Sequence, residues 1–322
     1  MISVAMCTFN GERFIEAQLR SIVAQSVPVD EIVVSDDGST DATIAIVVRV
    51  LDAHPSISYR VLRNEVALGV TKNFEQAVCA TSGDLIVLSD QDDVWYADRI
   101  ERARSRFEAD KHLLLVHAEA RLVDADGGPL GATLFEALEA TSWELGSIAS
   151  GHAIDVFLRR NLALGAAIMF RRQLLEAALP FDPHWVHDEW LAVIAAATGD
   201  GTVDFIPEPV IDYRQHGANQ IGVRKLSFRG KVGRLMEPRA QRNRRLLLAF
   251  EALLTRLGEL GVEPEVLTAA REKVAHERVR SALPAARVLR VLPVLTEVRT
   301  GRYRTKGRGA PDVLRDLVQP IG

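Results

Sequence analysis

Three carboxylates stand directly after an apolar run in the stretch LSDQDDVW, residues 88–95. Asp90, Asp92 and Asp93 follow residues 85–88, Leu-Ile-Val-Leu, which have the composition of a buried strand. Like charges brought together out of water repel one another and lose hydration, so such a cluster usually has a cation or a hydrogen-bonded ligand as its partner. Asp90 and Asp92 form a D-x-D pair, and Mg²⁺ favours sites of one or two carboxylates, waters and substrate phosphates. The stretch therefore predicts a divalent ion that also contacts a diphosphate.

Other common ligand motifs are absent from the sequence. Neither G-x-G-x-x-G nor G-x-x-x-x-G-K-[ST] occurs, which excludes the usual dinucleotide-binding and P-loop motifs. A calcium loop beginning at Asp90 also fails, because Val94 and Trp95 stand at the fifth and sixth positions, where a ligand and a glycine are expected.

The elements that must position these carboxylates alternate between strand and helix in the first half of the chain. Residues 2–8 and 31–35 have strand character, and residues 12–25 carry an apolar stripe at helical spacing. The stretch Ser-Thr-Asp at 39–41 offers cap candidates for a helix that ends near residue 51. Further strands are expected at 58–63, 84–89 and 113–117, and further helices at 72–80 and 98–108. Short β-α-β-α units with apolar strands predict an α/β fold with a mostly parallel, Rossmann-like sheet flanked by helices.

Polar side chains follow three of the expected strands. Thr8 and Asn10 come after the first, Asp36 and Asp37 after the second, and the carboxylate cluster after residues 84–89. Because ligands bind outside the carboxyl ends of parallel strands, we expect these three loops to converge on one crevice. Taken alone, the stretch Asp-Asp-Gly-Ser at 36–39 is also typical of a turn and helix cap.

Composition indicates a globular protein with a large core: 322 residues, 48% hydrophobic and 25% charged. Cys7 and Cys79 are too few and too far apart for a disulfide framework or a zinc site, and both are interpreted as small buried apolar residues. The first residues include no basic segment before a long apolar stretch, and no uncharged apolar run approaches the roughly 18 residues that a spanning helix needs. We expect a protein that is made and kept in the cytoplasm.

Charge is divided unequally along the chain. Residues 221–322 hold 22 lysines and arginines against 10 carboxylates, a formal charge of +12, which leaves −16 for residues 1–220. The basic part is helical in pattern, with candidates at 246–257, 266–281 and 285–298. It is either a solvated arginine-rich surface or a contact for anionic lipid, a lipid-linked phosphate or nucleic acid. The stretch 285–298, with Arg287 and Arg290 among leucines and valines, suits a packed helix or an interfacial one.

Seven stretches together resemble a known enzyme family. In the N-terminal part they are CTFNGERFIEAQLRSIVAQS, SDDGSTDAT, RNEVALGVTKNFEQA and SGDLIVLSDQDDVWYADRI; further on they are NLALGAAIMFRRQLLEAALPF, HDEWLAV and YRQHGANQIG. The first four are similar to the nucleotide-sugar half of family 2 glycosyltransferases with the GT-A fold, and the last three to the acceptor half of a bacterial branch with many rhamnosyltransferases. Their joint order is far more specific than any single motif. The resemblance implies a GT-A domain at 1–222, with its halves at about 1–118 and 119–222, and a basic helical extension at 223–322.

The resemblance also implies residue roles on the donor side. Asp90 would face the ribose, and Asp92 would bind the metal ion, Mg²⁺ or Mn²⁺, that bridges the diphosphate. Asp93 would lie behind these ligands. The nucleoside would contact Thr8, Asn10 and Asp37, with Asp36 as the alternative partner.

On the acceptor side the family places a carboxylate at the start of a helix as the base that deprotonates the acceptor hydroxyl. Asp188 occupies that position, and Glu189 is the alternative because it stands where a second aromatic residue is common. Adjacent helical residues do not share a face, so we expect only one of the two to point into the crevice. A zinc site at His184 and His187 is not favoured, because neither H-E-x-x-H nor H-x-x-E-H is present. Glu119 also departs from the branch, in which Asp is usual.

Two residues near position 215 complete the expected site. His216 is open to two interpretations, a structural histidine or one that completes the metal shell and touches the diphosphate. Arg214 is expected to meet phosphate.

The implied reaction is the inverting, metal-dependent transfer of a hexosyl group from a nucleotide sugar to a hydroxyl. The branch suggests dTDP-L-rhamnose as donor, and a glycan or lipid-linked acceptor in the synthesis of cell-surface polysaccharide, reached through peripheral contact of the basic extension with the inner face of the cytoplasmic membrane. A sugar-nucleotide pyrophosphorylase would share the metal carboxylates, but its glycine-rich loop is absent where Thr8-Phe9-Asn10 stands. A non-catalytic glycan-binding or membrane-binding module would not need both the D-x-D pair and a second carboxylate site.

Overall fold

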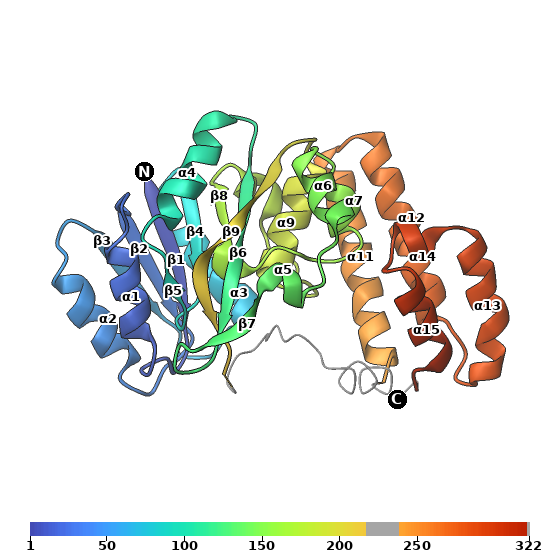
Figure 1. Ribbon diagram of the computed structural model, residues 1–322, viewed down its shortest axis with the longest axis horizontal. Helices are drawn as coiled ribbons and strands as arrows, with labels where there is room; N and C mark the ends of the chain where they lie inside the picture. The colour runs from blue at the N-terminus through green and yellow to red at the C-terminus, as the bar shows by residue number, and fades with distance from the viewer. Residues whose placement is uncertain (217–237, 321–322) are drawn as a thin grey trace.

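The computed structural model describes residues 1–216 and 238–320, and its centre is a nine-stranded sheet (Figure 1). The strand order is β3-β2-β1-β4-β8-β6-β9-β5, with β7 paired to β6. The strands are β1 (Ile2–Thr8), β2 (Glu31–Asp36), β3 (Ser58–Arg63), β4 (Leu85–Ser89), β5 (Val94–Trp95), β6 (Leu115–Val123), β7 (Pro129–Thr133), β8 (Met169–Arg171) and β9 (Val203–Arg214).

The helices of this body connect the strands. They are α1 (Ile15–Val23), α2 (Thr43–Asp52), α3 (Val70–Ala80), α4 (Arg99–Ala109), α5 (Leu134–Ala137), α6 (Ser142–Ala149), α7 (Ala153–Phe157), the 3₁₀ turn η1 (Gly165–Ala167), α8 (Leu174–Ala178) and α9 (His187–Ala197). After the undescribed stretch come α11 (Ala240–Leu260), α12 (Pro264–Ser281), α13 (Arg287–Arg299), α14 (Arg302–Thr305) and α15 (Ala310–Val318).

Pairing within the sheet is parallel where the donor loops emerge. The strands β3, β2, β1 and β4 pair with one another in parallel, and β6 runs parallel to β9. Between these two parallel groups the short strand β8 pairs antiparallel with both β4 and β6. The expected α/β class with a mostly parallel sheet is therefore confirmed.

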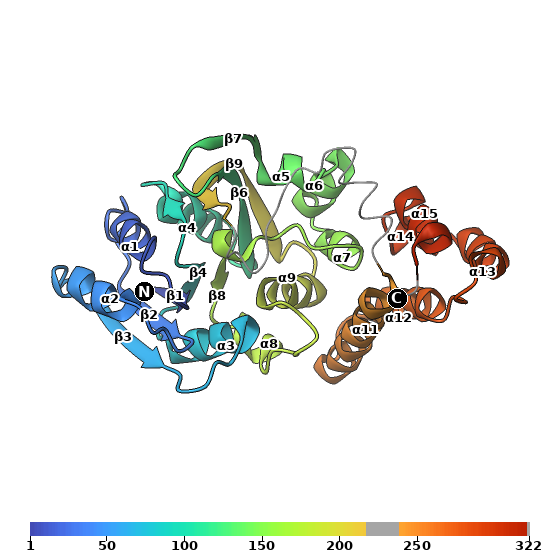
Figure 2. The ribbon, with the colours of Figure 1, turned by 90° about the horizontal axis from the view of Figure 1, so that it is seen from below.

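Two hydrophobic cores cover the two faces of the sheet. Along β1, Val4 and Met6 point into the core formed with α1, α2 and α4, whereas Ala5 and Cys7 point into the core formed with α3, α8 and α9. Seen from below (Figure 2), α1 and α4 lie on one side of the strands and α3 and α8 on the other. This alternation is the period-two pattern of a strand buried on both faces.

The helices after residue 238 are attached to the body through α11. Phe250 packs edge-to-face on Trp185 with ring centroids 5.0 Å apart, and the Trp185 indole N–H donates to the carbonyl of Ala249 at 2.8 Å. The helix α11 thereby shares the core that contains α3 and α9, while Leu283, Val294 and Tyr303 form a small separate core among α13 to α15. The predicted boundary between residues 222 and 223 lies outside the described residues.

The structure also describes the composition of the helices and the burial of the two cysteines. Within the described ranges, no helix combines the length and the apolar composition that crossing a bilayer requires. The prediction that both cysteines are buried is wrong for Cys79, which is exposed on α3, whereas Cys7 is buried in β1. The cause is that Phe74, Ala77 and Val78 form the buried face of α3 and leave Cys79 outside it.

Candidate active site

The loops after β1, β2 and β4 meet α3, α9 and the end of β9 around a cleft of about 370 Å³, the donor cleft. The predicted site residues that line it are Thr8, Asn10, Asp37, Asp90, Asp92, Asp188 and His216. Asp36, Arg214 and Glu189 are not among the lining residues. The three sequence-distant loops thus converge as expected, because β1 lies between β2 and β4 in the sheet.

Asp36 is buried behind the wall of the donor cleft and supports that wall through hydrogen bonds. Its fully buried carboxylate accepts hydrogen bonds from the Thr8 hydroxyl at 2.7 Å and from the Ser39 N–H at 2.9 Å. Asn10 adopts a left-handed conformation (φ 46°), and its Oδ1 accepts from the N–H of Thr40 at 2.9 Å. These contacts join the loops after β1 and β2 into one surface, with Thr8 and Asn10 facing the cleft.

Asp37 organises the loop that borders the cleft on the side of α3. Its carboxylate accepts from the backbone N–H groups of Leu68 at 2.7 Å and Gly69 at 2.9 Å, and from the Asn64 side chain at 3.0 Å. Gly69 has a φ of 78°, a conformation that favours glycine, where the loop turns into α3. The carboxylate and the loop after β3 therefore hold one another in place.

The carboxylate cluster after β4 meets residues from the end of β9. His216 Nε2 lies 2.7 Å from Asp92 Oδ2, and the imidazole stacks on Phe14 with ring centroids 4.7 Å apart. Arg214 approaches from behind, where its Nε donates to the backbone carbonyl of Asp92 at 2.7 Å and its N–H donates to Asp93 Oδ1 at 2.9 Å. Arg214 thus fixes the backbone of the cluster, and the expected contact with phosphate stays a prediction.

Burial and mutual repulsion shift the acidity of this cluster. Burial raises the pKa of Asp90, and the charge of Asp92 raises it further. Burial also raises the pKa of Asp92, although the hydrogen bond from His216 opposes that shift. Burial and mutual repulsion destabilise the ionised forms of these carboxylates, and a bound cation would stabilise them.

Asp188 lines the same cleft as the cluster and lies in the first turn of α9. Its Oδ2 accepts from the N–H of Gly165 at 2.9 Å, and its Oδ1 accepts from the N–H of Glu189 at 2.6 Å. Burial raises the pKa of Asp188 to about 7, and the neighbouring carboxylate of Glu189 raises it as well. A carboxylate with a pKa near neutrality suits a general base. Glu189 instead lines a second cavity, where the charge of Arg245 opposes the effect of burial on its pKa.

His187 also lines the donor cleft, although the sequence marked it only as a disfavoured zinc ligand. Its ring stacks on Phe74 with centroids 3.8 Å apart, neither ring nitrogen has a hydrogen-bond partner among the described residues, and burial lowers its pKa to about 3. His184 lies in the second cavity, so the two histidines do not share a site. Glu119 accepts from the N–H groups of Ala120 and Phe135 and supports the junction of β6 with α5.

The sequence did not predict several other lining residues, among them Phe14, Gln91 and Tyr213. Phe14 lies on the apolar stripe expected of α1, so nothing marked it as a partner of His216. Gln91 bridges the β1 and β4 loops, because its side-chain amide bonds both the N–H and the carbonyl of Phe9, at 2.9 and 3.0 Å.

Comparison with known proteins decides the family. The model of the family described as glycosyl transferase family 2 matches residues 3–174, more than half of the chain. The chain belongs to glycosyl transferase family 2. It is therefore a glycosyltransferase, and the resemblance read from its motifs is confirmed.

Individual relatives agree with the family assignment. A dTDP-rhamnosyl transferase, RfbG of Shigella flexneri, is 28% identical over 241 residues, which cover 71% of this chain and 78% of that protein. Among solved structures, S. aureus TarS 1-349 in complex with UDP-GlcNAc has a TM-score of 0.57 at 16% identity, covering 98% of this chain and 89% of that one. The mannosyltransferase PcManGT of Pyrobaculum calidifontis, in complex with GDP-Man and Mn²⁺, has a TM-score of 0.53 at 20% identity, covering 98% and 85%. These neighbours confirm the GT-A fold.

The donor set of this glycosyltransferase fits a divalent ion shared with a substrate. Within the described part of the chain, no group of three or more His, Cys, Asp and Glu side chains could hold a metal ion by itself. Asp92 and His216 supply one carboxylate oxygen and one imidazole nitrogen in contact at the edge of the cleft. An ion there would need further ligands from waters and from the phosphates of a bound donor, which is the coordination that Mg²⁺ favours.

Proposed function

We propose that the enzyme transfers a hexosyl group, with inversion and with the help of a divalent ion, from a nucleotide sugar to a hydroxyl of a glycan or lipid-linked acceptor in cell-surface polysaccharide synthesis. The observation that carries the proposal is that one cleft is lined both by the contacting pair Asp92 and His216 and by Asp188. The first pair suits a diphosphate with its metal ion, and the single carboxylate suits a base.

The donor is held by the parallel half of the sheet. Thr8, Asn10 and Asp37 line the same cleft and would contact the nucleoside, and Asp90, also in the lining, would face the ribose. The ion held by Asp92 and His216, Mg²⁺ or Mn²⁺, would neutralise the charge that develops on the leaving nucleoside diphosphate. The cleft walls would hold the donor in one orientation, which lowers the entropic part of the activation free energy.

Asp188 receives the proton of the acceptor hydroxyl. Two backbone N–H groups, from Gly165 and Glu189, orient its carboxylate, and the surrounding protein keeps its pKa near 7. As the hydroxyl oxygen attacks the anomeric carbon, its proton moves to Asp188, and the bond to the diphosphate breaks on the opposite side. An in-line displacement of this kind inverts the configuration and needs no enzyme nucleophile.

The proposed donor is dTDP-L-rhamnose. Its support is the likeness of the acceptor-half motifs to rhamnosyltransferases and the relation to RfbG, whose name states dTDP-rhamnosyl transfer. A panel of nucleotide sugars tests this choice: the full-length enzyme with Mn²⁺ should be stabilised by dTDP-rhamnose and should hydrolyse or transfer it faster than UDP-glucose, UDP-GlcNAc or GDP-mannose. Turnover with a UDP-hexose and none with dTDP-rhamnose would contradict the donor assignment.

Peripheral membrane contact belongs to the same proposal, together with a domain boundary near residue 222. On α13, Val294 is buried, but Val288, Leu289 and Leu292 are 83%, 64% and 71% exposed. Exposed Arg287 and Arg299 stand at the two ends of this helix. An apolar helix face flanked by cations is typical of a helix that lies in the surface of an anionic membrane, where a lipid-linked acceptor resides.

A further inference from the structure

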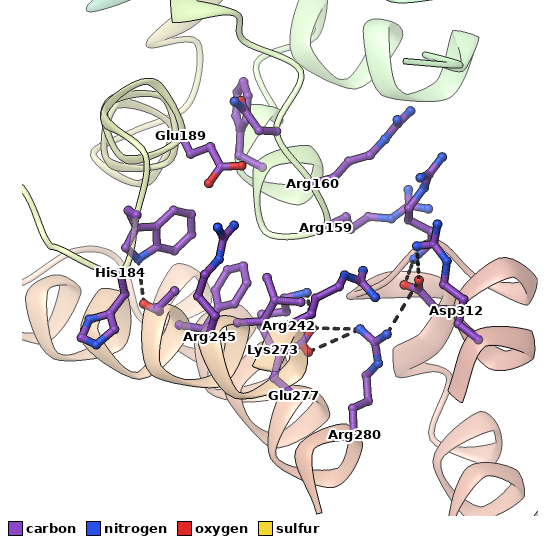
Figure 3. A pocket seen from close by; sticks show the side chains of 18 of the residues that line it. Arg159, Arg160, His184, Glu189, Arg242, Arg245, Lys273, Glu277, Arg280 and Asp312 are labelled. Carbon is purple, nitrogen blue, oxygen red and sulfur yellow. Dashed lines mark hydrogen bonds and ion pairs between the residues drawn. The ribbon is translucent and has the colours of Figure 1, made fainter. Parts of the chain in front are cut away.

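A second cavity of about 500 Å³ is lined by residues of the body, including α9, and of the C-terminal helices (Figure 3). We call it the basic cavity. Among the described residues, eight arginine and lysine side chains line it against three carboxylates. Six of the cations belong to its walls: Arg159, Arg160, Arg242, Arg245, Arg308 and Arg315. No step of the proposed reaction uses them.

The cations on the floor of the basic cavity form ion pairs with buried carboxylates. Lys273 lies 2.7 Å from Glu277, and Arg280 lies 3.3 Å from Glu277 and 2.7 Å from Asp316. Asp312 adds a further carboxylate 3.8 Å from Arg280. Each cation in this buried network has a carboxylate partner, so we interpret the network as part of the structural support of the cavity.

The wall formed by α11 is different. Arg242 and Arg245 lie nearly one turn apart on the same helix face, and neither makes a hydrogen bond or an ion pair with any residue in the described ranges. Figure 3 shows Arg245 rising from α11 toward the helix that carries Glu189. Desolvation by the surrounding protein and the charge of Arg280 lower the pKa of Arg242, and the charges of Asp312, Glu277 and Asp316 oppose that shift. Arg242 and Arg245 are both exposed to solvent, so an anion that enters the cavity can reach them.

The shape and lining of the basic cavity indicate what kind of anion it suits. Guanidinium groups match phosphate oxygens with paired hydrogen bonds. Leu246, Trp185 and Phe250 supply apolar surface beside the arginines. A volume of this size holds a small-molecule ligand with a polar head and an apolar or sugar part.

We propose that the basic cavity binds a diphosphate group through Arg242 and Arg245. Residues 184–189 connect this site to the donor cleft: His184, Trp185 and Glu189 line the basic cavity, whereas Val186, His187 and Asp188 line the donor cleft. The diphosphate is that of a lipid-linked acceptor, whose sugar then lies near Asp188, or a free anion. The acceptor source rests on the proposed function, whereas the anion site does not.

Calorimetry with inorganic pyrophosphate tests the site in the full-length protein. EDTA keeps metal ions from the donor cleft. Wild type should bind pyrophosphate, and Arg242→Gln/Arg245→Gln should bind it at least tenfold more weakly. Arg244→Gln is the matched control, because Arg244 is an exposed arginine on the same helix that does not line the cavity. Equal affinity in the double variant, or no binding by wild type at millimolar pyrophosphate, would overturn the proposal.

Two measurements keep the result interpretable. The melting temperature checks that the double variant is folded, and Arg242→Lys/Arg245→Lys, which keeps both charges, should bind pyrophosphate more tightly than the glutamine pair. Affinity for dTDP with Mn²⁺ should be the same in all variants, since these arginines lie outside the donor cleft. A protein that binds pyrophosphate but transfers no sugar would leave the anion site standing while the proposed function fails.

Farnesyl diphosphate separates the two sources of the ligand. If the site serves a lipid-linked acceptor, this short polyprenyl diphosphate should bind at least tenfold more tightly than pyrophosphate, and the gain should be lost in Arg242→Gln/Arg245→Gln. If the site serves a free anion, the two probes should bind with similar affinity.

Discussion

Asp188 and Glu189 are adjacent in the first turn of α9, yet their carboxylates line different cavities. Asp188 faces the donor cleft with hydrogen bonds from two backbone N–H groups, and Glu189 faces the basic cavity. The divergence follows from helix geometry, in which successive side chains point about 100° apart.

Replacement of Asp188 by Asn should therefore lower kcat by about 10² to 10⁴, the usual loss when a general base is removed. Donor affinity should change little, because the proposed role of Asp188 is to take the proton of the acceptor and not to bind the donor. Glu189→Gln is the matched control and should stay within a few-fold of wild type. Steady-state rates and donor binding by calorimetry check both; a large loss in Glu189→Gln alone would assign the base to Glu189.

The rate should rise with pH through about 7. Asp188 acts as a base only when ionised, and its pKa is raised to about 7, so activity is present above that pH and lost as pH falls through it. Between pH 6 and pH 8 the ionised fraction grows from about one eleventh to about ten elevenths, which predicts a rise of about tenfold in kcat/KM. A flat profile over this range would contradict the assignment.

Gly165→Ala should slow catalysis without unfolding the protein. A Cβ at Gly165 would come within 2.8 Å of His187 Nε2 and 3.4 Å of the Asp188 Cβ, and the His187 ring cannot retreat because it stacks on Phe74. Displacement of the base by about 1 Å can cost on the order of 10² in rate. Gly146→Ala is the control, because a Cβ there meets nothing within 4 Å. Unchanged kcat in Gly165→Ala would show that the loop before β8 does not position Asp188.

Binding to anionic vesicles should depend on the exposed face of α13. Leu289→Ser/Leu292→Ser should reduce co-sedimentation, whereas Val66→Ser, which removes an apolar side chain that is 78% exposed on the body, should not. Binding should weaken as salt rises, since each cation near an anionic surface contributes about 1 kcal/mol and its attraction falls off within a Debye length. Equal sedimentation of the α13 variant and wild type would exclude this helix as the contact.

The parallel half of the fold was predictable because its signals are local. The strand at 58–63 and the helix ends near residues 80 and 281 follow from apolar spacing, and the position of the carboxylates after β4 follows from the strand itself. The insertion of β8 between β4 and β6 was not predictable, because a three-residue strand has no periodicity. Which of Asp188 and Glu189 lines the donor cleft depends on the rotation of α9, which tertiary packing sets. The basic cavity is lined by residues of α9, α11, α12 and α15, which are distant in sequence.

The central claim is that Asp92 binds the ion that holds the diphosphate of the donor, and one calorimetric comparison tests it directly. Affinity of wild type for dTDP should rise at least about tenfold when Mn²⁺ is added, since the ion joins Asp92 and His216 to the phosphates. In Asp92→Asn, with an unchanged melting transition, Mn²⁺ should no longer affect dTDP affinity. A variant that keeps the full Mn²⁺-dependent gain would remove Asp92 from the metal site and contradict the account.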